Sequence, residues 1–323
     1  MNAPGQEAKA ALQQDVDISV SLCGIRLSNP TILASGVLGL SRDLLLRVAE
    51  NGAGAATIKS VSLEPREGHP SPTIIAYEAG MLNAVGYANA GVESAAEEFR
   101  DVANMPIPIF ASAIGSNADE FAAVAEKLMK CGFAALELPL SCPHTPGFGL
   151  LAGHSSPEAT EKITRAVRQA TDKPIFVKVS PNVPALGEQV LAALEAGADG
   201  ISAVNTLGPG MIINLETRRP VLDFKVGGVS GPALRPIAVR CVYDVWAAMK
   251  KAGRQAPIIG IGGVSTGPHA LEMIMAGATA VGIGTGVYQR GIGVFRLVAD
   301  ELGQECRRLG IKSLDEVRGA AHG

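Results

Sequence analysis

One cysteine stands where a catalytic thiol would be useful. Cys142 lies in the stretch 140–144 (LSCPH), directly after an apolar run typical of a buried strand, and proline and glycine are frequent in the loop that follows. A thiol at the end of a strand can reach a bound molecule, and it can move a proton near neutral pH when its surroundings adjust its pKa. A lone cysteine is more often an inert packing residue. We interpret the remaining cysteines in that way: Cys23, Cys131, Cys241 and Cys306.

Two lysines interrupt runs that otherwise read as buried strands. Lys59 lies in 56–60 (ATIKS) and Lys178 in 175–179 (IFVKV). A buried lysine is costly unless it meets an anion. A reduced flavin carries negative charge near its pyrimidine ring and would satisfy such lysines. The alternatives are an ion pair with a carboxylate on a neighbouring strand, such as Glu137, or a Schiff-base lysine in a non-redox aldolase or isomerase. We favour the bound anion.

Two glycine turns indicate a phosphate site. The stretch 262–264 (GGV) follows the seventh predicted strand, and 284–286 (GTG) closes the eighth. Backbone N–H groups that no side chain covers, followed by a short helix, form a cradle for an anion. Each turn alone is also explained as an ordinary tight turn in a glycine-rich chain. As a pair at the ends of consecutive final strands, the turns favour phosphate binding.

Amide and hydroxyl side chains gather after the second and sixth predicted strands: Asn83, Asn89, Asn205 and Thr206. An amide offers both a donor and an acceptor, which suits recognition of a cyclic imide or a carboxylate. Asparagine is also a frequent turn residue, so a purely structural role stays open for each of them.

Eight short apolar runs supply the strands that would position these residues. They cover residues 31–34, 55–60, 107–112, 133–138, 174–179, 199–204, 257–261 and 279–284. Their hydrophobicity is nearly continuous, as in parallel strands that are buried on both faces. Helical patterns alternate with them and begin at capping residues such as Ser41, Asn117 and Ser156. The pattern predicts a (β/α)8 TIM barrel. A doubly wound sheet is less favoured, because the first βα turn lacks GxGxxG.

Several segments lie outside the repeating units. Residues 18–22 and 25–27 predict a hairpin that precedes the first strand and plugs the barrel floor. Longer insertions at 61–105 and 206–232 follow the second and sixth strands, so we expect them on the catalytic face, where they act as lids. We expect a flexible N-terminal tail at 1–17, one FMN-binding barrel domain at 18–310 and a C-terminal tail at 311–323.

Composition excludes several classes of function. The chain has 323 residues and a net charge of −3, without the run of lysine and arginine that nucleic-acid binding requires. No apolar stretch approaches the roughly 18 residues of a membrane span, so we expect a cytoplasmic protein without membrane contact. Neither cysteine nor histidine shows metal-ligand spacing, so no metal is expected. We interpret three histidines as surface residues: His69, His154 and His269.

Taken together, the motifs resemble the dihydroorotate dehydrogenase family, in its soluble class 1 with a cysteine base. The matching stretches are 34–36 (ASG), 57–60 (TIKS), 62–66 (SLEPR), 80–86 (GMLNAVG), 141–143 (SCP), 204–206 (VNT), 216–222 (ETRRPVL), 227–233 (GGVSGPA) and the two glycine turns. The order GMLNAVG, ETRRPVL, GGVSGPA is most similar to the catalytic subunit of the NAD-linked subtype, 1B. The similarity runs from about Val20 to Leu302.

The resemblance implies FMN-dependent oxidation of dihydroorotate to orotate in pyrimidine biosynthesis. Hydride would pass from C6 of the substrate to N5 of the flavin while Cys142 removes the proton from C5. The implied FMN-binding residues are Ser35, Lys59, Ser60, Lys178, Val204, Gly231, Gly262, Gly263, Gly284 and Thr285. The implied substrate-binding residues are Lys59, Asn83, Ala84, Val85, Gly86, Tyr87, Asn205 and Thr206. The subtype also implies a homodimer, or a heterotetramer with an electron-transfer subunit that carries FAD and an iron–sulfur cluster.

The chain departs from the family pattern at three positions. The family usually has asparagine where Pro139, Ser112 and His144 stand here. Proline has neither a polar side chain nor a backbone N–H, so hydrogen bonds to the flavin and the pyrimidine are lost. Two alternatives therefore remain within the resemblance. One is an FMN oxidoreductase for another dihydropyrimidine-like or unsaturated cyclic compound, and the other is a paralogue that binds FMN without turnover.

Overall fold

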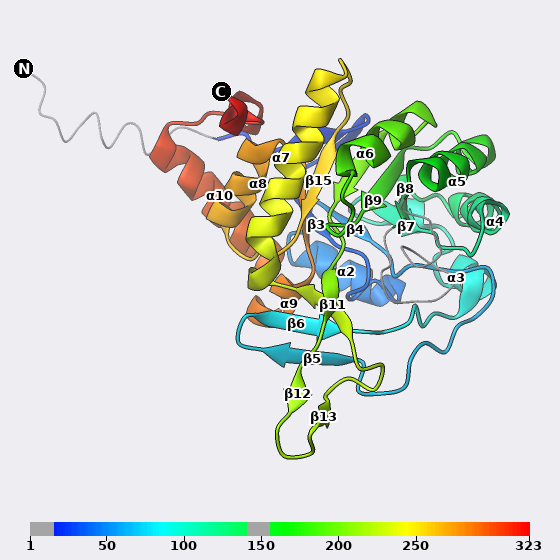
Figure 1. The fold of residues 1–323 in the computed structure, drawn as a ribbon. Coiled ribbons are helices and arrows are strands. Elements are labelled where there is room, and N and C mark those ends of the chain that lie inside the picture. The colour runs from blue at the N-terminus through cyan, green and yellow to red at the C-terminus, as the bar shows by residue number, and fades with distance from the viewer. Residues whose placement is uncertain (1–15, 141–155) are drawn as a thin grey trace, which may run out of the picture.

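Eight parallel strands close into a barrel in the computed structural model, which describes residues 16–140 and 156–323 (Figure 1). Around the barrel the order is β10-β15-β16-β3-β4-β7-β8-β9. The strands are β3 (Thr31–Leu33), β4 (Ala55–Thr57), β7 (Ile109–Ser112), β8 (Ala135–Pro139), β9 (Ile175–Val179), β10 (Gly200–Ala203), β15 (Ile258–Ile261) and β16 (Ala280–Ile283). Each lies at one of the eight predicted runs, so the predicted TIM barrel is confirmed.

Helices surround the barrel and complete the alternating β/α units (Figure 1). They are α2 (Arg42–Glu50), α3 (Gly91–Glu98), α4 (Ala118–Met129), α5 (Pro157–Ala170), α6 (Leu186–Glu195), α7 (Arg235–Lys251), α8 (Gly267–Ala276), α9 (Thr285–Arg290) and α10 (Val294–Leu309). The predicted caps are confirmed, because Ser41, Asn117 and Ser156 each accept a hydrogen bond from the backbone N–H three residues later. Such caps satisfy donors that the first turn of a helix leaves open.

The interior of the barrel is apolar toward the amino ends of the strands and polar near their carboxyl ends. Phe110 and Phe176 stack inside, with ring centroids 5.9 Å apart. Higher up, Lys178 lines the cavity described below, and its in-register neighbour Ser202 shares the inward face. The registers continue the inward face to Glu137 and Ser112, both buried. The strands thus carry charge only toward the end at which the cavity opens.

An N-terminal hairpin covers the opposite end of the barrel, as predicted. Strands β1 (Val20–Leu22) and β2 (Ile25–Leu27) pair antiparallel, and the side chains of Leu22 and Leu27 are buried. The thiol of Cys23 lies 3.5 Å from the carbonyl oxygen of Asp199, which directly precedes β10. The hairpin therefore contacts the amino ends of the strands. At the other terminus, the short 3-10 helices η4 (Leu314–Glu316) and η5 (Ala320–His322) end the chain, and the ring of His322 stacks on Tyr243.

The two insertions join into one antiparallel sheet at the carboxyl end of the barrel (Figure 1). Its strands, in the order β11-β14-β6-β5, are β11 (Leu207–Gly210), β14 (Gly227–Ser230), β6 (Gly80–Asn83) and β5 (Ile74–Tyr77). A smaller hairpin, β12 (Ile213–Asn214) with β13 (Arg219–Pro220), projects beyond this sheet. Two short 3-10 helices, η1 (Val102–Asn104) and η3 (Pro232–Leu234), end the insertions. The sequence places both insertions on this face but does not predict that they pair.

Within residues 16–140 and 156–323, no helix has the length and apolarity needed to cross a bilayer. The same residues contain no cluster of histidine, cysteine or carboxylate side chains suited to a metal ion.

We predict that Gly200→Ala destabilises the barrel. A Cβ atom at this position would lie 2.4 Å from Cε1 of Phe176, and the closed barrel gives that ring no room to move. Overpacking of this kind costs about 1–3 kcal/mol, so the melting temperature should fall. Gly303→Ala in α10 is the matched control, since the nearest atom to its added Cβ is a flexible arginine terminus at 3.7 Å. Alanine there favours the helix. A melting temperature equal to the parent's in Gly200→Ala would contradict this packing.

Candidate functional site

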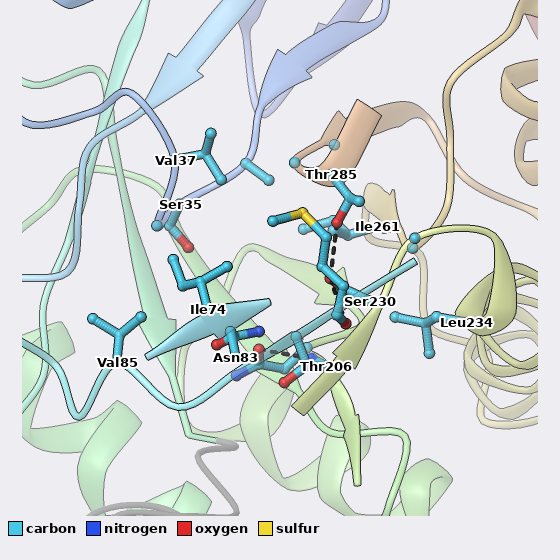
Figure 2. A pocket seen from close by; sticks show the side chains of 18 of the residues that line it. Ser35, Val37, Ile74, Asn83, Val85, Thr206, Ser230, Leu234, Ile261 and Thr285 are labelled. Carbon is cyan, nitrogen blue, oxygen red and sulfur yellow. Dashed lines mark hydrogen bonds between the residues drawn. The ribbon is translucent and has the colours of Figure 1, made fainter. Parts of the chain in front are cut away.

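A cavity of about 470 Å³ opens at the carboxyl ends of the barrel strands, between the barrel and the insertion sheet (Figure 2). It contains every described residue for which the sequence predicted contact with cofactor or substrate. These are Ser35, Lys59, Ser60, Asn83, Ala84, Val85, Gly86, Tyr87, Lys178, Val204, Asn205, Thr206, Gly231, Gly262, Gly263, Gly284 and Thr285. Its volume lies within the range of small-molecule and cofactor sites. Residues from distant parts of the chain therefore line the same cavity.

Two cationic side chains line this cavity. Lys59 follows β4, and Lys178 lies in β9, where it is 5% exposed. The Nζ atom of Lys178 lies 3.5 Å from Oε1 of Glu137 and donates a hydrogen bond of 3.0 Å to Oγ of Ser35. Ser35 in turn donates to the same Glu137 oxygen at 2.6 Å. The ion pair that the sequence left as an alternative is thus present, and the lysine nevertheless faces the cavity.

Glycine turns form another part of the wall. Gly262 and Gly263, directly after β15, have φ of 142° and 71°, and Gly231 has φ of 86°. A Cβ on Gly263 would lie 2.7 Å from the carbonyl oxygen of Gly231, so these two turns approach each other more closely than side chains permit. Oγ1 of Thr285, at the start of α9, donates a 2.8 Å hydrogen bond to Oγ of Ser230 (Figure 2). The result is a backbone cradle suited to an anionic group.

The amide-bearing wall comes from both insertions. Asn83 in β6 donates from Nδ2 to the carbonyl oxygen of Gly228 in β14, at 3.2 Å. The backbone N–H of Thr206 donates to Oδ1 of Asn205 at 2.8 Å. A Cβ on Gly227 would lie 2.6 Å from the carbonyl oxygen of Asn83, so this glycine allows the two insertions to meet. Figure 2 shows Asn83 and Thr206 beside each other on one side of the cavity.

Asn89 serves the structural role that the sequence left open. Its Oδ1 accepts hydrogen bonds from the backbone N–H groups of Ser62 and Gly91, and its Nδ2 donates to the Ser62 hydroxyl. It holds the chain that leads into α3, and it is not among the residues that line the cavity.

The interpretation of His69 as a surface residue is wrong. Its ring lies in the cavity wall, stacked on Phe224 with centroids 3.9 Å apart and planes 5° apart. Its Nδ1 lies 3.0 Å from the carbonyl oxygen of Ala84, and the backbone N–H donates to Val85. A Cβ on Gly86 would lie 2.7 Å from the backbone nitrogen of His69. No local sequence signal identifies this position, because the two segments meet only through the fold.

Of the other two histidines, His269 is half-buried in α8, where burial lowers its pKa, and His154 lies outside the described residues. Cys142 and His144 also lie outside them, so the structure leaves the predicted catalytic thiol without a position. Pro139 ends β8 and lines the cavity three residues before Cys142. The last position that departs from the family pattern, Ser112, is buried with its Oγ 2.9 Å from that of Ser60.

The four cysteines in the described residues are unpaired by disulfides. Burial raises the pKa of each thiol, to about 11 for Cys23 and Cys241. A thiol with so high a pKa is protonated at neutral pH and is a poor nucleophile or base. Cys241 and Cys306 are buried and Cys131 is partly buried, which agrees with their interpretation as packing residues, whereas Cys23 is exposed on the N-terminal hairpin.

Comparison with known proteins identifies relatives along nearly the whole chain. The family model described as dihydroorotate dehydrogenase matches residues 17–306. The protein named dihydroorotate dehydrogenase B (NAD(+)), catalytic subunit, from Pyrococcus abyssi is 43% identical over 304 residues, covering 94% of this chain and 99% of that protein. The protein of the same name from Methanocaldococcus jannaschii is 40% identical over 309 residues, covering 94% and 98%.

A solved structure gives the same picture of the fold. The chain aligns with a DHODH from Eimeria tenella, crystallised in complex with ferulenol, with a TM-score of 0.81. The alignment covers 98% of this chain and 93% of the other, at 23% sequence identity. At that identity the likeness supports the barrel fold alone.

Proposed function

The chain belongs to the dihydroorotate dehydrogenase family, and we propose that it oxidises dihydroorotate to orotate in pyrimidine biosynthesis with FMN bound in the cavity described above. The observation that carries this proposal is the convergence of the predicted cofactor and substrate residues on that one cavity. They come from strands all around the barrel and from both insertions, and only a common ligand-binding role accounts for their assembly.

The residues present fit FMN. The cavity provides a backbone cradle at Gly262, Gly263 and Gly284 for a phosphate, and a Cβ on Gly262 or Gly263 would clash with Ala238 or Arg235 of α7. It also provides two cations, Lys59 and Lys178, for a ring that gains negative charge when it is reduced. Ser35, Ser60, Val204, Gly231 and Thr285 complete the proposed cofactor wall. When bound, FMN supplies the acceptor for the hydride.

The proposed substrate wall is formed by Lys59, Asn83, Ala84, Val85, Gly86, Tyr87, Asn205 and Thr206. Asn83 is held by its hydrogen bond to Gly228 in β14, and Thr206 lies against the same glycine, so these contacts are in place before substrate arrives. Such preorganisation is how a protein orients a small ring for reaction. Lys59 provides a positive charge suited to the carboxylate of dihydroorotate.

Cys142 is the proposed base. It removes the proton from C5 of dihydroorotate while hydride leaves C6, and the electron pair of the C5–H bond becomes the new double bond of orotate. Strand β8 delivers the chain to the cavity at Pro139, so three peptide units separate a residue of the wall from the thiol.

A second candidate function follows from the apolar side of the cavity. Pro139 contributes a ring with no hydrogen-bonding side chain, where the family usually has an amide. Ser112 is hydrogen-bonded to Ser60 and buried. The same chemistry on another dihydropyrimidine-like or unsaturated cyclic compound, one that lacks a polar group at this edge, is therefore the alternative. A missing hydrogen bond of this kind costs about 1–3 kcal/mol.

We also propose an electron-transfer partner. Relatives at 40–43% identity are named as catalytic subunits, which implies a second subunit in their complexes. For this chain we propose a partner that carries FAD and an iron–sulfur cluster, in a heterotetramer built on a homodimer, in the cytoplasm. Tyr288 and Ile74 line the cavity yet are 66% and 50% exposed, so the rim presents the apolar surface that a docking protein would cover.

The proposed function is tested by anaerobic mixing of the purified, FMN-loaded protein with dihydroorotate. We expect the yellow flavin to bleach, and to do so faster with dihydroorotate than with dihydrouracil or dihydrothymine. Absorbance in a stopped-flow instrument measures the rate. Faster bleaching with one of the other two compounds would favour the alternative substrate class. A folded, colourless protein that takes up no FMN would refute the flavin site itself.

We predict that Cys142→Ser retains FMN but slows flavin reduction by about 100-fold or more at neutral pH. Serine has a far higher pKa than cysteine and is a poor unassisted base, and a positioned base contributes about 10²–10⁴ to the rate. Single-turnover reduction with dihydroorotate measures the effect. The control is Cys131→Ser, in the loop that connects α4 to β8. Reduction at the parent rate in Cys142→Ser would exclude the assigned role.

A further inference from the structure

A buried carboxylate stands behind the cation of the proposed flavin site. Glu137 and Lys178 have side chains only 4% and 6% exposed, and their nearest atoms lie 3.5 Å apart. Ser35 connects them, because it donates to Oε1 of Glu137 at 2.6 Å and accepts from Nζ of Lys178 at 3.0 Å. The three residues come from β8, from the turn after β3 and from β9, so three separate strands of the closed barrel position them.

The three residues differ in their relation to the cavity. Ser35 and Lys178 line it, whereas Glu137 does not. The carboxylate is therefore a neighbour of the residues that would touch the ligand and does not contact the ligand itself. Two protein groups share one of its oxygens, and this fixes the position of the lysine ammonium and part of its electrostatic effect.

The charges of this pair act in opposite directions on an electron acceptor in the cavity. A cation stabilises the negative charge that a flavin gains on reduction, and a carboxylate behind the cation weakens that stabilisation. At low exposure neither effect is screened by solvent as it would be at the surface. Both the orientation of the lysine and the strength of its field therefore depend on Glu137.

We propose that Glu137 sets the reduction potential of the bound flavin, both by its own negative charge and by positioning Ser35 and Lys178. It holds the ammonium toward the cavity and lowers the flavin's potential below the value that an uncompensated lysine would give. This inference rests on the proposed flavin site and adds to it a residue outside the cavity wall. A merely structural ion pair would affect stability and leave the potential unchanged.

The test is the midpoint potential of FMN bound to Glu137→Gln, measured by equilibrium titration against a reference dye. Glutamine has nearly the same shape and keeps an oxygen for Ser35, but it removes the negative charge. We expect the reduced flavin to be favoured about tenfold more than in the parent, which for a two-electron couple is a rise of about 30 mV. Glu137→Asp, which keeps the charge, should stay nearer the parent value.

The matched control is Glu126→Gln on α4. Glu126 also pairs with a lysine, Lys130 at 2.8 Å, but the two side chains are 59% and 72% exposed and distant from the cavity lining. We expect the flavin potential of this variant to equal that of the parent. An unchanged or lowered potential in Glu137→Gln would overturn the inference.

A second comparison covers the case in which Glu137→Gln does not fold. Lys178→Gln and the double variant Lys178→Gln with Glu137→Gln differ by the same carboxylate, and the double variant buries no unpaired charge. The potential should be higher in the double variant, and equal potentials would overturn the inference. FMN binding to the parent is measured separately by fluorescence quenching. A parent that binds no FMN refutes the proposed function, whereas a parent that binds it with variants of equal potential refutes only the role of Glu137.

Discussion

Burial of charge inside an apolar barrel requires a partner for every charged group, and this requirement organises the end of the barrel at which the cavity opens. An isolated ion in such an interior is far too costly to persist. Lys178 is therefore found with Glu137 and Ser35, each supplied by a different part of the barrel. The arrangement needs a closed sheet, because only closure brings β3 near enough to β8 and β9. The closed barrel and the polar cluster therefore both follow from one requirement, that each buried charge has a partner.

Close approach of backbones is the second requirement, and glycine meets it at several points. Gly200 admits the ring of Phe176 at the lower end of the barrel, and Gly263 allows two turns to meet at the cavity. Gly227 does the same between the insertions, where it meets the backbone of Asn83. The stacked rings of Phe110 and Phe176 support the polar layer that contains Lys178, and the insertion sheet covers the cavity on its other side. Each part of the cavity is consequently fixed by contacts that exist without ligand.

Local sequence patterns predict the elements that form from neighbouring residues, which are the barrel strands and the starts of the helices. Continuous apolar runs predicted all eight barrel strands, and polar caps such as Ser41 predicted where helices begin. The pairing of the two insertions was not predictable, because β6 and β14 are far apart in the chain and each is short and rich in glycine. His69 was misplaced for the same reason, since the pairing of the insertions brings Phe224 to its ring, while Ala84 reaches it within its own insertion.

The two walls of the cavity differ in how they respond to substitution. The proposed anion cradle is made by backbone at Gly262, Gly263 and Gly284, and a side chain at Gly262 or Gly263 would clash with α7. The opposite wall is made by side chains, and there every substitution changes what is recognised. Pro139 lies in the cavity where the family usually has asparagine, and its ring offers neither the donor nor the acceptor of an amide. A cradle made of backbone can therefore be kept while the contacts to the bound rings shift, so the departures from the family pattern at Pro139 and Ser112 bear on how the proposed rings are held and leave the proposed phosphate cradle unchanged.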